Sequence, residues 1–246
     1  MAVLTFKRTE KKYLMSEETY LRLREAMEPY MQVDQYGLHT ICNIYYDTEH
    51  YDLIRTSLDK PVYKEKLRLR SYGIPTDTST VYLEIKKKCD GIVYKRRIGL
   101  KYVDAVRYLE NGVLPKKDSQ ILHEIDYFIH FYKPEPKLFL AYDRIAMFGK
   151  ENPDFRLTFD TNIRSREDDL DLRLGDRGEL LFGSDPAHRY LLEVKIDGAM
   201  PLWLSHILTD LQIWPTSFSK YGAIYSAKIN SDSNREILKE ELSYDI

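Results

Sequence analysis

The sequence of 246 residues is poor in cysteine and in long apolar runs, and each shortage excludes a class of protein. It has two cysteines, Cys42 and Cys89, whose positions fit neither a metal-ligand spacing nor a disulfide framework. No segment approaches the roughly 18 uninterrupted apolar residues that a membrane-spanning helix needs. The start, MAVLTFKRTEKKYL, becomes charged within seven positions and does not resemble a secretory signal. These absences predict a cytoplasmic protein with reduced thiols and no membrane span.

Linkers and familiar catalytic groupings are also missing. No stretch rich in Pro, Gly or Ser divides the chain, and no internal repeat is apparent, which predicts a single domain over residues 1–246 with an acidic tail at about 230–246. No Ser-His-Asp or Cys-His arrangement is evident. His188 and His206 lack the paired spacing of metal ligands, so we expect surface or core roles for them.

A concentrated block of positive charge is what the sequence does have. Between Lys60 and Lys101 there are twelve Lys and Arg but four Asp and Glu, so this window carries +8. Because the whole chain carries −2, the remainder carries −10. A basic block in an otherwise acidic protein favours a local anionic ligand over general adhesion to nucleic acid or membrane.

Hydrophobic periodicity predicts a chain dominated by strands. Helices are expected after the N-cap Ser16 and over residues 101–110, 118–132, 201–211 and 220–229, and CDG at 89–91 is expected to be a hairpin turn. Eight strands are expected over residues 4–14, 39–48, 62–73, 79–88, 92–98, 137–148, 154–167 and 189–197. Consecutive strands usually pair antiparallel, and eight strands can close a small barrel. The predicted fold class is therefore α+β: a closed eight-stranded antiparallel β-barrel with helices packed on the outside.

The stretch KEKLRLRSYG, residues 64–73, shows how charge is arranged on these strands. Its side-chain period of two places Lys66, Arg68 and Arg70 on one face and Leu67 and Leu69 on the other. On an isolated strand the cations would face water. The same alternation recurs on strand after strand, so in a barrel the polar faces would line the interior and helices would cover the apolar faces. Inward cations repel one another unless a polyanion, with a divalent metal on the few inward carboxylates, lies among them.

Nine stretches of the chain, spanning residues 8 to about 225, carry a family resemblance. In order they are RTEKKYLM, NIYYDTEHYDL, KLRLRSYG, VYLEIKKK, YKRRIGL, YDRIAMF, FRLTFDTNIRSR, LLEVKIDGAMPLWL and SFSKYGAIY. Together they resemble the VTC (vacuolar transporter chaperone) polyphosphate polymerase domain, within the triphosphate tunnel metalloenzymes. The resemblance implies a closed barrel whose basic tunnel binds a triphosphate end with Mn²⁺ or Mg²⁺.

The resemblance also implies roles for individual residues. Glu193 is expected to hold the metal, helped by Glu10, while Asp160 is equally compatible with a hydrogen bond beside a turn and with a role in the site. Ser217 departs from the family, which often has lysine there. The expected phosphate ligands are Lys12, Lys66, Arg68, Arg70, Lys86, Lys95, Arg97, Arg144, Arg156, Lys195 and Lys220. Those expected to act directly in catalysis are Arg68, Arg70, Lys86, Arg144, Arg156, Glu193, Lys195 and Lys220.

Three functions remain compatible with such a site. The first is phosphoryl transfer from ATP or another triphosphate to inorganic polyphosphate, which requires positioning and charge neutralisation more than covalent chemistry. The second is hydrolysis of tripolyphosphate or an organic triphosphate, for which Glu10, Glu84 or Asp160 would orient water. The third is a non-catalytic sensor of polyphosphate or nucleotide. Nucleic-acid binding ranks last, because the basic strands lack interleaved exposed aromatics.

Overall fold

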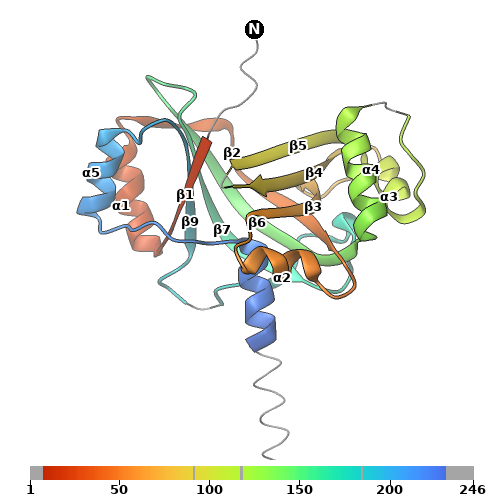
Figure 1. Ribbon diagram of the computed structural model, residues 1–246. Helices are drawn as coiled ribbons and strands as arrows, with labels where there is room; N and C mark the ends of the chain where they lie inside the picture. The colour runs from red at the N-terminus through yellow and green to blue at the C-terminus, as the bar shows by residue number, and fades with distance from the viewer. Residues whose placement is uncertain (1–7, 91, 117–118, 184, 231–246) are drawn as a thin grey trace, which may run out of the picture.

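The computed structural model describes residues 8–90, 92–116, 119–183 and 185–230, and its dominant feature is one curved antiparallel sheet (Figure 1). In the described chain this sheet has nine strands in the order β1-β9-β7-β6-β2-β3-β4-β5, and β8 pairs with β7. The strands are β1 (Arg8–Met15), β2 (Met31–Asp47), β3 (Tyr63–Tyr72), β4 (Thr80–Cys89), β5 (Ile92–Lys101), β6 (Glu135–Gly149), β7 (Arg156–Arg166), β8 (Glu179–Leu180) and β9 (Tyr190–Asp197).

Helices lie in groups along the sheet (Figure 1). They are α1 (Glu17–Met27), α2 (Asp52–Leu58), α3 (Tyr102–Asn111), α4 (Gln120–Tyr132), the short η1 (Leu172–Leu174) and α5 (Leu202–Asp210), and residues 220–230 are also helical. Helix α1 begins as predicted, because the Ser16 hydroxyl accepts a hydrogen bond from the Thr19 amide at 3.2 Å. Helix α2 was not predicted. Its start is fixed by Asp47, whose carboxylate accepts the amides of Leu53 and Ile54.

The apolar strand faces are covered by helices, as the alternation predicted. Helices α3 and α4 pack beside β3–β5, and α1 and α5 pack beside β1 and β9 at the other side of the sheet (Figure 1). Leu67 and Leu69 are 0% exposed and share a core cluster with Ile125 and Phe128 of α4. Burying each leucine contributes about 1.5–3 kcal/mol, which fixes the register of β3 and so turns Lys66, Arg68 and Arg70 to the inner face.

The predicted closure of the barrel is not confirmed. Within the described residues β1 pairs with β9 alone and β5 with β4 alone, so the sheet is not closed by hydrogen bonds. Strand number permits closure, but closure also depends on strand tilt and register shift, which a sequence pattern does not encode. Strand β2 is also longer than predicted, because Gly37, with φ +56°, and a register shift between Val33 and Leu38 interrupt its alternation.

Parts of the sequence-based prediction lie outside the described residues: the start of the first strand at residues 4–7, Gly91 of the expected hairpin turn, and the acidic tail from residue 231. Among the helices that the structure does describe, none combines the length and the apolar character needed to cross a bilayer.

Candidate functional site

A cavity of about 800 Å³ lies against the inner face of the sheet and is strongly basic. Twelve lysines and arginines but three glutamates line it in the described chain, the glutamates being Glu10, Glu84 and Glu193. The basic residues are Lys12, Lys60, Lys64, Lys66, Arg68, Arg70, Lys86, Lys88, Lys95, Arg144, Lys195 and Lys220. Such an excess of one sign is stable only where water or a bound anion compensates it.

One part of the lining is a ladder of lysines on three neighbouring strands. Lys64 of β3 is opposite Lys88 of β4, and Lys66 is opposite Lys86, which in turn is opposite Lys95 of β5. Like charges directly opposite one another destabilise a sheet. Burial, assisted by the neighbouring lysines, lowers the pKa of Lys66 to about 8. Lys86 has no hydrogen bond or ion pair with any described residue, so this ladder has spare capacity for an anion.

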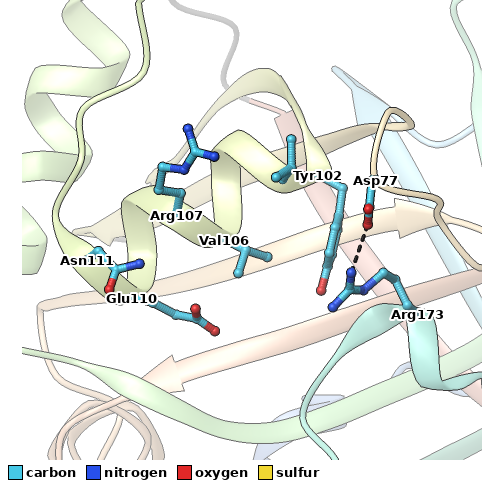
Figure 2. A pocket seen from close by; sticks show the side chains of 8 residues that line it. Asp77, Tyr102, Val106, Arg107, Glu110, Asn111 and Arg173 are labelled. Atoms are coloured by element: carbon cyan, nitrogen blue, oxygen red, sulfur yellow. Dashed lines mark hydrogen bonds and ion pairs between the residues drawn. The ribbon is translucent and has the colours of Figure 1, made fainter.

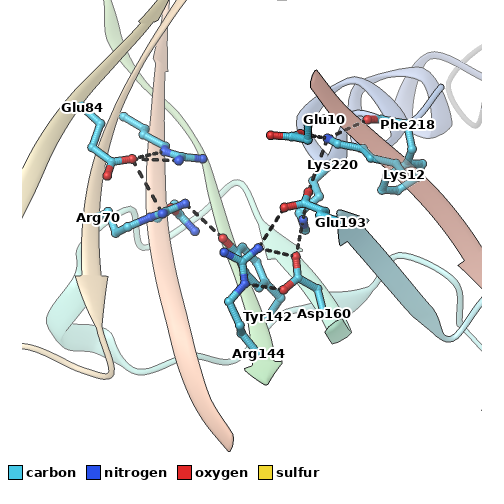
Figure 3. Close-up of polar contacts among 12 residues, drawn as sticks. Glu10, Lys12, Arg70, Glu84, Tyr142, Arg144, Asp160, Glu193, Phe218 and Lys220 are labelled. Atoms are coloured by element: carbon cyan, nitrogen blue, oxygen red, sulfur yellow. Dashed lines mark hydrogen bonds and ion pairs between the residues drawn. The ribbon is translucent and has the colours of Figure 1, made fainter. Parts of the chain in front are cut away.

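Arg68 and Arg70 are held in place by fixed polar partners (Figure 3). Arg68 donates to Glu84 at 2.8 Å and to the Tyr45 hydroxyl at 3.0 Å. Arg70 donates to Asn43 at 2.9 Å and to the Tyr142 hydroxyl at 3.0 Å. Burial raises the pKa of Glu84, but the two guanidinium groups overcome this and bring it to about 2, so its charge is retained. The two guanidinium planes are thereby preorganised for a bidentate anion such as a phosphate.

A second charged cluster joins β6, β7 and β9 to the helix that begins at Lys220 (Figure 3). Arg144 contacts Asp160 through two nitrogens, at 2.5 and 2.7 Å, and Glu193 at 3.1 Å. Lys220 lies 2.5 Å from Asp160 and 3.1 Å from Glu193. Asp160 is 0% exposed within β7 and does not itself line the cavity, but it pairs with Arg144 and Lys220, which do. Burial opposes the charge on Glu193, but Lys220, Lys12 and Arg144 hold the pKa of its carboxyl well below its usual range.

Glu10 and Glu193 form the place where a divalent cation fits best. Lys12 Nζ lies between them, 3.2 Å from Glu10 and 3.4 Å from Glu193. The hydroxyl of Thr158, directly opposite Glu193 in register, is buried without a hydrogen-bond partner in the described chain. No group of three or more His, Cys, Asp or Glu residues suited to a metal occurs among the described residues. Mg²⁺ is commonly bound by one or two carboxylates plus substrate phosphates, so these residues fit a cation that a phosphate helps to hold.

Eleven of the thirteen predicted site residues line this one cavity, and two do not. Arg97 shares the inner face but lies over the Tyr82 ring at 4.7 Å, and Arg156 is exposed, with its Nε 3.5 Å from the Pro153 carbonyl. Ser217 does line the cavity. Sequence reasoning missed two groups: the lining lysines Lys60 and Lys64, and the arginine partners Asn43, Tyr45 and Tyr142. Lys64 lies two residues before Lys66 and therefore on the same face of β3, so the alternation of the strand could have identified it.

A smaller cavity of about 240 Å³ lies beside α3 and has a different character (Figure 2). Its most prominent cation, Arg173, is paired with Asp77 at 2.8 Å and with Asp171 at 2.7 Å, and it lies over the Tyr102 ring. The two lining cations, Arg107 and Arg173, are matched by two lining acids, Asp77 and Glu110, so the cavity has no comparable demand for an anion. The large basic cavity is therefore the candidate site.

Comparison with solved structures identifies the class of fold. A proposed adenylate cyclase from Bacillus halodurans matches with a TM-score of 0.53 at 15% identity, covering 87% of this chain and 95% of that one. A proposed adenylyl cyclase from Hippeastrum, described as having a dominant triphosphatase activity, matches with a TM-score of 0.54 at 16% identity, covering 89% and 95%. The chain shares the fold of these two proteins.

The family follows from the sequence itself. The model of the VTC domain matches residues 7–228, so this chain belongs to the VTC domain family. No protein of curated function matches the chain.

Proposed function

We propose that this protein transfers a phosphoryl group from a nucleoside triphosphate to inorganic polyphosphate in the basic cavity, with Mn²⁺ or Mg²⁺ as cofactor. The observation that carries the proposal is the ladder of opposed lysines beside two preorganised arginines, with twelve lining cations against three glutamates. A polyphosphate is an anion of matching charge density and extended shape. Membership of the VTC domain family and a fold shared with a protein of triphosphatase activity support the same chemistry.

The protein's own groups act mainly by positioning. Arg68 and Arg70 hold the equatorial oxygens of a bound triphosphate, each with a fork that its partners have already oriented. Arg144 extends this clamp from the other side of the cavity. Lysines supply further positive charge. This charge compensates the negative charge that shifts between phosphates during transfer. No covalent enzyme intermediate is required.

Glu10 and Glu193 are the residues that would hold the divalent cation. The cation would supply positive charge to neutralise the negative charge that develops on the phosphate oxygens. Lys12 lies between the two carboxylates and also donates to the Phe218 carbonyl at 3.1 Å, so its ammonium group is held where it would contact a bound phosphate.

Hydrolysis is the second candidate, and Glu10 is the observation that favours it. Glu84 and Asp160 are buried and ion-paired with several arginines and lysines, whereas the Glu10 side chain is 31% exposed and is ion-paired with Lys12 alone in the described chain. A carboxylate with a free oxygen beside bound phosphate can orient a water molecule for attack. Transfer and hydrolysis therefore share one clamp and differ in the acceptor.

Incubation of the purified protein with ATP and Mn²⁺ tests the proposal. We expect ADP together with a ladder of polyphosphate, and we expect Glu193→Gln to nearly abolish turnover. Tripolyphosphate affinity in this variant should persist, because the loss of one negative charge leaves the cations in place. Glu124→Gln is the matched control, since Glu124 is also ion-paired but lies outside the cavity, with Lys87 and Arg96.

Each other outcome identifies a rival. ADP and free phosphate without polymer would establish a triphosphatase. Tight tripolyphosphate binding without turnover under any divalent metal would establish a sensor. Full activity in Glu193→Gln would remove Glu193 as the metal ligand and make Glu10 the next residue to substitute.

A further inference from the structure

An aromatic cluster lies on the inner face of the sheet, just beyond the arginines and outside the cavity lining. It comprises His39 of β2, Tyr72 of β3 and Tyr82 of β4, accompanied by Arg97 of β5. The rings of Tyr72 and Tyr82 are 5.7 Å apart at 85°, and those of His39 and Tyr72 are 6.1 Å apart. Since the four residues come from four adjacent strands, the cluster is a property of the sheet and not of one segment.

The register of the sheet places this cluster next to the phosphate clamp. Tyr82 is directly opposite Arg70, and His39 is directly opposite Arg144. Tyr72 follows Arg70 by two residues on the same face, a step of about 7 Å. If the phosphates of a ligand lie on the arginines, the group attached to its phosphate chain therefore lies within reach of the aromatic rings.

The Tyr72 ring is open to solvent, and contacts with Arg97 fix how the rings of the cluster are arranged. Tyr72 is 51% exposed. The Arg97 guanidinium lies 4.7 Å from the centre of the Tyr82 ring and donates to the Tyr72 hydroxyl at 3.4 Å. An arginine beside exposed aromatic rings is the composition that stacks nucleobases.

We propose that Tyr72, Tyr82, His39 and Arg97 form a subsite for the base of a nucleoside triphosphate whose phosphates are held by Arg68, Arg70 and Arg144. This inference rests on the proposed function, because it needs the phosphates in the cavity. It adds the place where the base of the donor lies and a preference for a purine, whose larger ring system stacks over more area.

Calorimetric titration of the full chain with two ligands tests the subsite. Adenylyl imidodiphosphate, a slowly hydrolysed analogue of ATP, carries a base, and tripolyphosphate does not. We expect Tyr72→Leu to lower the affinity for the analogue about tenfold and the affinity for tripolyphosphate less than twofold. A tenfold loss is what the stacking of a base on one aromatic ring provides. Tyr72→Trp should restore the affinity for the analogue. Tyr94→Leu is the matched control, because Tyr94 is 44% exposed but belongs to the outer face of β5.

The results separate the subsite from the proposed function. Equal losses for both ligands, or no loss for either, would overturn the subsite while leaving the phosphate site intact. An absence of tripolyphosphate binding by the unmodified protein would instead overturn the proposed function, and the subsite with it. If Tyr72→Leu does not fold, the exposed Arg97→Gln takes its place, with a smaller but equally selective loss expected for the analogue.

Discussion

The two ends of β3 present different cations to the cavity. Lys64 and Lys66 lie near its start, and Arg68 and Arg70 lie toward its end, where Tyr72 follows. Eight residues separate Lys64 from Tyr72, a span of about 26 Å in an extended strand. The lysine end continues with Lys60 and Lys88, while the arginine end continues with the aromatic cluster.

The difference lies in how firmly each cation is held. Arg70 contacts Asn43 and Tyr142 and is nearly buried, whereas Lys66 has a single hydrogen bond, 3.3 Å long, to the Ser219 hydroxyl within the described chain. An arginine fork with fixed partners can define the position of one phosphate. A lysine is a mobile point charge that follows any phosphate near it. Under the proposed function, the arginine end would hold the donor in one position and the lysine end would accommodate the polymer.

Arg70→Lys should disrupt anion binding at the arginine end and have the largest effect on affinity. An ammonium group cannot reach Asn43 and Tyr142 together, so it loses both the bidentate contact and its own orientation. We expect tripolyphosphate to bind about thirtyfold to hundredfold more weakly, corresponding to about 2–3 kcal/mol. Calorimetric titration is the measurement, with a thermal melt to confirm folding. Lys66→Arg is the reciprocal control, and a loss of similar size there would erase the distinction between the ends.

The pH dependence of binding should distinguish the ends next. The pKa of Lys66 is lowered to about 8, so this lysine loses its proton as the pH rises through 8, and a bound polyanion would restore it. Binding above pH 8 therefore takes up a proton, and the affinity contributed by Lys66 falls about tenfold between pH 7 and pH 9.

Lys66→Arg supplies the reference for this measurement, because arginine keeps its charge throughout the range. Tripolyphosphate itself gains negative charge as the pH rises, but it does so equally with both proteins. We expect the ratio of the two affinities to change with pH. Parallel profiles from pH 6 to 9 would show that Lys66 stays charged without ligand.

Lys88→Ala should affect long polymers selectively. Lys88 is exposed at the lysine end, far from the arginines, so tripolyphosphate on the clamp should not reach it. We expect long-chain polyphosphate to bind about fivefold more weakly and with a shallower salt dependence, while tripolyphosphate is unchanged. Lys11→Ala, an exposed lysine on the outer side of β1, is the control. Equal losses for short and long chains would contradict the assignment of an end for the polymer.

Ser217→Lys should add a positive charge at the lysine end and have the smallest effect on ligand binding. Ser217 lines the cavity next to Phe218, whose carbonyl accepts a hydrogen bond from Lys12 at 3.1 Å. An added lysine here would strengthen contact with the acceptor chain, so we expect longer products on gels with ATP affinity changed less than about twofold. If the length distribution does not move, position 217 makes no contact with the acceptor.

The sequence predicted the faces of the strands well, because alternation is a local property. Leu67 and Leu69 had to be buried, and that alone turned Arg68 and Arg70 inward. Closure of the barrel could not be predicted in the same way, since it depends on the tilt of all strands at once. Helix α2 was missed because its amides are capped by Asp47, a residue of the preceding strand.

Charges were predicted more reliably than their partners. Glu84 was one of three carboxylates considered for orienting water in the hydrolytic alternative, and it is enclosed by Arg68, Arg70 and Lys95, a grouping that needs three strands in register. Exposed aromatics were judged absent because each strand was considered separately. Tyr72 and Tyr82 are single residues within basic strands, and they become neighbours when β3 and β4 pair.

Threading is the difficulty that a closed ring poses for a long polymer, because the chain must enter by one of its ends. In the described chain the sheet instead has a seam between β1 and β5, where no backbone hydrogen bond joins the two strands. No rung of a β-ladder would have to break for that seam to widen. A polymer of any length, even one whose ends are blocked or joined, therefore has a topologically permitted route onto the lysines from the side.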